Sequence, residues 1–120
     1  MPQDTNAARD LAEALARVAD QKKASEIVLL DVRGRHSLFD FFVVATAGSD
    51  RHAEVIGDEA ARWAKAEGLA TRHVDVSPDW VCGDFGDVVL HVFTPEARAF
   101  YDLENLWADA PRVAFEAASA

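Results

Sequence analysis

Trp80-Val81-Cys82-Gly83-Asp84-Phe85-Gly86-Asp87-Val88-Val89-Leu90-His91-Val92-Phe93 is the stretch of sequence that decides the fold. Apolar, aromatic and β-branched residues fill both halves, and Gly86 stands between them where a tight turn is needed. The pattern predicts two strands, 80–85 and 87–93, joined as an antiparallel hairpin. Thr94-Pro95-Glu96 then predicts the start of a last helix, because a hydroxyl caps it, proline fits its first position and an acid suits its positive end.

The chain before the hairpin alternates between helical and strand patterns. Apolar residues recur at helical spacing over 5–22 and again over 53–68, where Gly68 provides a C-cap. The runs 27–32 and 41–46 are short, apolar and rich in β-branched residues, which indicates strands buried on both faces. A weaker strand is predicted over 71–76, and a one-turn helix over 37–40.

This order of elements predicts the α/β class, with a mixed five-stranded β-sheet flanked by helices in a topology similar to that of the nucleotidyltransferases. At 120 residues the chain suits one compact domain. We expect that domain to cover residues 1–113 and residues 114–120 to form a flexible C-terminal tail. The last helix is expected to include Phe100, Leu103 and Trp107.

The charge of the chain is strongly negative and unevenly distributed. Residues 73–120 hold nine of the 21 Asp and Glu residues but only two of the 12 Lys and Arg residues, so −7 of the net charge of −9 lies there. A negative surface disfavours phosphate contacts, so we expect no direct sequence-specific binding of nucleic acid. An acidic block keeps a protein soluble and also attracts basic partners, and charge alone does not choose between these roles.

The sequence carries neither a secretory leader pattern nor an apolar run of the roughly 20 residues that span a bilayer. We therefore expect a soluble cytoplasmic protein without membrane contact. Cys82 is the sole cysteine, which excludes an internal disulfide and a CxxC site, and a small apolar strand residue is its simplest interpretation.

The candidate catalytic residues do not form a complete set. Asp84-Phe85-Gly86 matches the metal-binding tripeptide of protein kinases, but the other kinase motifs are missing. Asp87 and His91 share a strand face yet lie about 13 Å apart, too far for one metal ion. Asp31 is followed two residues on by Arg33, which competes with a cation. We predict no catalytic residue, no bound metal and no cofactor.

Several segments of the chain together resemble the sequence pattern of a known family. Ser37-Leu38-x-Asp40-Phe41-Phe42-Val43, Ser49-x-Arg51-His52, the hairpin 80–93 and the stretch 97–107 resemble the pattern of the RsfS/iojap family of ribosomal silencing factors, in unbroken order over residues 8–113. The chain departs from that pattern at Cys82-Gly83, where the family carries bulky apolar residues. Glycine inside a strand weakens it or marks a bulge.

The resemblance implies a translational repressor that binds ribosomal protein uL14 on the large ribosomal subunit and sterically blocks joining of the small subunit. It also implies a homodimer in the free state and no enzymatic reaction. The family's partner-binding surface falls on Trp80 and Phe85, and we expect the acids of the hairpin, Asp84 and Asp87, to belong to it as well. Aromatic anchors and acidic rims suit such an interface, although large aromatic residues also dominate cores.

Two other functions stay open from the residues alone. One is a nucleotidyltransferase-like enzyme that uses magnesium with Asp31, Asp84 or Asp87, and the other is a dimeric adaptor for another basic protein. The alanine-rich stripe of residues 8–19 would pack closely on a sheet or on a second copy of the chain.

Overall fold

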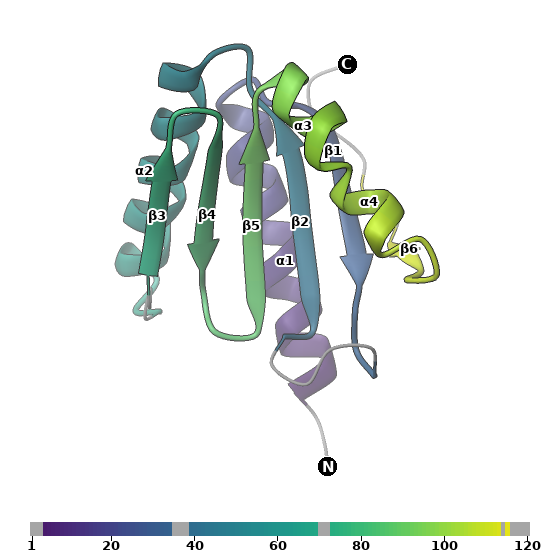
Figure 1. Cartoon of the computed structure of the whole chain (residues 1–120). Coiled ribbons are helices and arrows are strands. Elements are labelled where there is room, and N and C mark those ends of the chain that lie inside the picture. Colours follow the sequence, from purple (N-terminus) through teal and green to yellow (C-terminus); the bar gives the residue numbers. More distant parts are fainter. Residues whose placement is uncertain (1–3, 35–38, 70–72, 114, 116–120) are drawn as a thin grey trace.

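The computed structural model describes residues 4–34, 39–69, 73–113 and 115 of the chain (Figure 1). The predicted one-turn helix over 37–40 falls largely outside these residues. The elements follow in the order α1 (Asp4–Gln21), β1 (Ser25–Asp31), β2 (Phe41–Thr46), α2 (Asp50–Ala66), β3 (His73–Ser77), β4 (Trp80–Asp84), β5 (Val88–Phe93), α3 (Pro95–Tyr101), α4 (Leu103–Leu106) and β6 (Arg112–Val113). None of the helices in these ranges is long and apolar enough to cross a membrane.

The strands form one mixed sheet in the order β3-β4-β5-β2-β1-β6. β2 and β5 run parallel, and the other neighbouring pairs are antiparallel. The predicted hairpin is confirmed, with Trp80 opposite Phe93 and Asp84 opposite Val89. The prediction of five strands misses β6, which pairs with Leu29 and Leu30 of β1.

The two faces of the sheet are covered differently (Figure 1). α1 and α2 lie behind the sheet and bury one side chain in two from β5 and β2, such as Leu90 and Val43. α3 and α4 lie on the opposite face toward β1, where Ala97 and Trp107 pack on Phe42 and Phe93. Because strand residues alternate between faces, each central strand contributes to two separate cores.

Small residues let both large helices approach the sheet closely. Ala8, Ala12 and Ala16 of α1 are almost fully buried in the core, so the alanine stripe packs on the sheet. In α2, a Cβ atom added at Gly57 would lie 2.7 Å from Val81 Cγ1. Glycine is therefore required at this contact, although it weakens a helix interior.

The last helix is broken in two, where the sequence predicts one continuous helix. Asp102 ends α3 in the left-handed conformation with φ of 49°, and α4 begins at the next residue. Arg98 fixes this arrangement, because its Nε donates to Glu104 Oε1 at 2.9 Å and its Nη1 donates to Thr46 Oγ1 at 2.8 Å. Nη1 also donates to the main-chain carbonyl of Glu26. The guanidinium thus joins both short helices to the sheet.

Of the two possibilities for Gly83, a weakened strand or a bulge, the structure shows no bulge. β4 keeps a regular register with both neighbours, Val74 on β3 and Leu90 on β5. A Cβ atom at Gly83 would lie 2.8 Å from Cε2 of Phe85. The glycine makes room for this aromatic ring, which folds back over the strand.

Candidate partner-binding face

Among the described residues, no helix lies in front of the half of the sheet formed by β3 and β4 (Figure 1). The register aligns side chains across this face in rows, with Asp75, Cys82 and His91 in one row. The next row toward the β4–β5 turn contains Asp84. We call this surface, with Trp80 at its other end, the open face. It carries aromatic, acidic and histidine side chains instead of an apolar layer.

Trp80 is the aromatic residue that β4 contributes to the open face. Its ring lies 4.9 Å from the ring of Phe93 and 4.8 Å from that of Tyr101, centroid to centroid. Its indole N–H donates to Nδ1 of His91 at 3.3 Å. Trp80 is only partly buried, so part of the ring remains available for contact.

His91 lies beside Trp80 and is only 6% exposed. The ring of Phe42 contacts it edge to face, with centroids 5.0 Å apart. Burial lowers the pKa of His91 to about 4, because an imidazolium ion would lose its hydration among these aromatic rings. His91 is therefore neutral at pH 7. Its Nε2 atom is buried and has no hydrogen-bond partner among the described residues.

A pocket of about 270 Å³ opens between His91 and the β4–β5 turn. Its apolar wall comes from Phe39, Phe42, Cys82 and Val89, and its polar rim comes from His73, Asp75 and Asp84. Burial raises the pKa of the Cys82 thiol, and the nearby carboxylates of Asp75 and Asp84 raise it further. Cys82 therefore remains a protonated thiol, which is a poor nucleophile.

The structure divides the four predicted site residues between two faces. Trp80 and Asp84 lie on the open face, and Asp84 Oδ1 accepts the main-chain N–H of Gly86 at 2.9 Å. Phe85 points to the opposite face and is 6% exposed within the core beneath α1 and α2. Asp87 is exposed in the turn. The ring of Phe85 is therefore almost wholly buried in the free chain.

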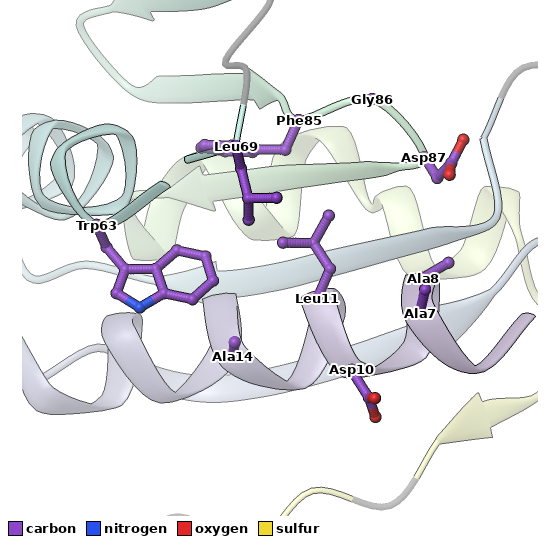
Figure 2. Close-up of a pocket in the computed structure, with 10 residues that line it drawn as sticks. All are labelled: Ala7, Ala8, Asp10, Leu11, Ala14, Trp63, Leu69, Phe85, Gly86 and Asp87. Carbon is purple, nitrogen blue, oxygen red and sulfur yellow. The ribbon is translucent and has the colours of Figure 1, made fainter. Parts of the chain in front are cut away.

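A second pocket, of about 520 Å³, lies on the helical side of the sheet. Figure 2 shows Leu11, Trp63, Leu69 and Phe85 converging on it from different elements, while Asp10 points away. Gly86 and Asp87 line its other end. The motif 84–87 thus contributes to two hollows, one on each side of the sheet.

The carboxylates considered for magnesium do not meet. Arg33 donates to both carboxylate oxygens of Asp31, from Nε at 2.8 Å and from Nη2 at 2.5 Å. β1, which carries Asp31, is separated from β4 by β2 and β5, about 14 Å across the sheet at ordinary strand spacing. Asp31 and Asp84 are therefore too far apart to share an ion. No group of three or more His, Cys, Asp or Glu side chains in the described ranges could hold a metal.

Sequence reasoning missed two aromatic members of this face. Tyr101 is 42% exposed and contacts Trp80 from α3, and Phe42 contacts His91 from β2. Both follow regular core patterns in their own elements, so only the packing of α3 and β2 around β5 reveals them. A weak signal for Tyr101 exists, since it is adjacent to Phe100 near the end of a predicted helix.

The fold and the open face define a small α/β protein with a mixed sheet and one uncovered aromatic and acidic surface. The family model described as "Ribosomal silencing factor during starvation", RsfS, matches residues 5–120. The chain therefore belongs to the RsfS family of ribosomal silencing factors.

Individual relatives agree with this assignment. The chain is 34% identical over 110 residues to "Ribosomal silencing factor RsfS" of Halalkalibacterium halodurans, covering 90% of this chain and 94% of the relative. It is 33% identical over 105 residues to the protein of that name from Bacillus subtilis, covering 86% and 89%. A crystal structure of a Chromobacterium violaceum protein superposes with a TM-score of 0.81 at 30% identity, covering 93% of this chain and 96% of the other.

Proposed function

We propose that this protein represses translation by binding ribosomal protein uL14 on the large ribosomal subunit, and that the bound protein sterically blocks joining of the small subunit. The observation that carries the proposal is the partly exposed Trp80 on a sheet face that no described helix covers. An aromatic side chain of this kind is the usual anchor of a protein interface. Membership of the RsfS family supports the ribosome as the partner.

In this proposal the four residues of the motif have different roles. Trp80 provides the desolvated contact area, and Asp84 and Asp87 select a basic partner by charge. Phe85 supports the hairpin from the core, because its ring is nearly inaccessible. The negative charge of residues 73–120 favours encounter with a basic protein surface.

Subunit joining tests the biological part of the proposal. Purified small and large subunits are mixed with increasing amounts of the protein and separated on sucrose gradients. We expect the fraction of joined ribosomes to fall as the large subunits become saturated. An unchanged fraction at saturation would contradict the steric mechanism.

Replacement of Trp80 tests the surface. We expect Trp80→Ala to weaken binding to large subunits by more than tenfold, which corresponds to about 1.4 kcal/mol or more. Trp63→Ala is the matched control, because Trp63 is also partly buried but lies on the helical side of the sheet. Equal loss of binding in both variants would show that the effect comes from general destabilisation and not from the open face.

The proposal also includes the state of the free protein. We place it in the cytoplasm as a homodimer that acts without a cofactor, a metal or a catalysed reaction. Phe100 and Leu106, 81% and 75% exposed, offer apolar surface for self-association. Sedimentation velocity of the wild-type protein and of Phe100→Ser measures this directly, and a monomer at all concentrations would remove the dimer from the proposal.

A further inference from the structure

We propose that His91 determines specificity within this surface, by donating its Nε2–H to a main-chain carbonyl of a basic segment that the partner inserts into the pocket beside Trp80. This inference rests on the proposed function and names the chemistry of the contact. It concerns the pocket of about 270 Å³ lined by Phe42, Cys82 and His91.

The hydrogen bond from Trp80 fixes the tautomer of His91. An indole N–H only donates, so Nδ1 of His91 must accept it through its lone pair. A neutral imidazole carries one proton, which then resides on Nε2. His91 therefore presents a donor at Nε2.

That donor is unsatisfied in the free chain. Nε2 is closed off from solvent and has no hydrogen-bond partner among the described residues. Buried polar groups in folded proteins are nearly always paired, because an unpaired one loses its hydration without compensation. Most buried histidines with a purely structural role have both ring nitrogens paired. The unpaired donor indicates that its acceptor comes from another molecule.

The surroundings of the pocket select the kind of acceptor. Asp75 and Asp84 on its rim repel a carboxylate, so a neutral carbonyl is favoured as the acceptor. The same two acids attract Lys or Arg side chains that flank such a carbonyl. Because solvent does not reach Nε2, the carbonyl must displace a neighbouring wall residue as it docks, and the partly buried ring of Phe39 lies at the wall.

Two substitutions distinguish the hydrogen-bonding roles of the two ring nitrogens of His91. H91N places a polar atom where Nδ1 accepts from Trp80, but it lacks a donor at the position of Nε2. H91Q extends its amide to the position of Nε2 and can donate there, while it loses the acceptor near Cβ. We measure binding of both variants and of the wild-type protein to purified large subunits at pH 7.5, and we record thermal unfolding to verify that each variant is folded.

We expect H91N to weaken binding by at least tenfold and H91Q to stay within about threefold of wild type. Wild-type affinity in H91N, or an equal loss in both variants, would overturn the role of Nε2. A ¹⁵N spectrum of the free protein with the proton on Nδ1 would overturn it as well, whether or not the variants fold. If the wild-type protein itself does not bind large subunits, the proposed function is wrong. If it binds but the two variants do not differ as expected, only the role of Nε2 is wrong.

Discussion

Acid is predicted to destabilise this protein through His91. The unfolded chain exposes this side chain with an ordinary pKa of 6.5, whereas burial in the folded protein lowers the pKa to about 4. As the pH falls below 6.5, the unfolded state takes up a proton that the folded state does not, so the free energy of unfolding decreases. The loss continues as the pH falls through the folded-state pKa of about 4 and is complete only below it, once both states are protonated.

The difference of about 2.5 pKa units corresponds to about 3 kcal/mol between neutral pH and pH 4. About 2 kcal/mol of this is lost by pH 5. Such a loss is a substantial fraction of the roughly 5 to 15 kcal/mol that stabilise a typical domain. The neighbouring titratable groups, which are His73, Asp75, Cys82 and Asp84, are the same in wild type and in a variant of His91.

Urea unfolding of wild type and H91N at pH 7.5, 6 and 5 measures the effect. We expect the wild-type free energy of unfolding to fall by about 2 kcal/mol more than that of H91N over this range. In addition, the NMR titration of the His91 ring should show no protonation above pH 5. Parallel stability curves for the two proteins, or a His91 that titrates near 6.5, would refute the reasoning from burial.

Two further substitutions test the packing of the helices on the two faces of the sheet. Arg98→Met should lower the free energy of unfolding, measured by urea titration, by about 2 to 3 kcal/mol. The reason is that Glu104 loses the hydrogen bond from Arg98 that lowers its pKa. An unchanged urea midpoint would contradict this role of Arg98. Gly57→Ala should destabilise by about 1 kcal/mol despite a gain of similar size in helix propensity, since the new methyl group collides with Val81. In a Val81→Ala background Gly57→Ala should cost less, and equal costs in both backgrounds would show that this contact is not the cause.

Local chemistry made most of the fold predictable. The strand patterns on either side of Gly86 are strong, and the N-cap of α3 places a hydroxyl, a proline and an acid in order, with Thr94 Oγ1 accepting from Ala97 N–H. The N-cap of α2 is likewise local, since Ser49 accepts the main-chain N–H of His52. These elements form from residues close together in the sequence, so the sequence pattern contains their cause.

The missed features depend on contacts distant in the sequence. β6 consists of only Arg112 and Val113, which form a strand because β1 offers an unpaired edge. The break at Asp102 depends on Arg98, which reaches Thr46 on another element. None of these causes is visible in a short window of sequence.

Only part of the candidate site could be predicted, because the rest depends on how distant elements pack on the sheet. Alternation along β4 places Trp80 and Phe85 on opposite faces of the sheet, and this follows from their odd spacing of five residues. The spacing does not say which face the helices cover. Because α1 and α2 both pack on the Phe85 side, Trp80 and not Phe85 is left for a partner.

The broken C-terminal helix explains why the open face stays open. Asp102 turns the chain after Tyr101, and Trp107 then packs on Phe42 with ring centroids 5.3 Å apart. α3 and α4 thereby cover the β1 side of the sheet and leave β4 uncovered (Figure 1). A typical domain would bury such a face to gain hydrophobic stabilisation. Here a partly exposed indole and an unpaired buried donor persist side by side at Trp80 and His91, a combination that a binding partner would stabilise and that packing alone does not explain.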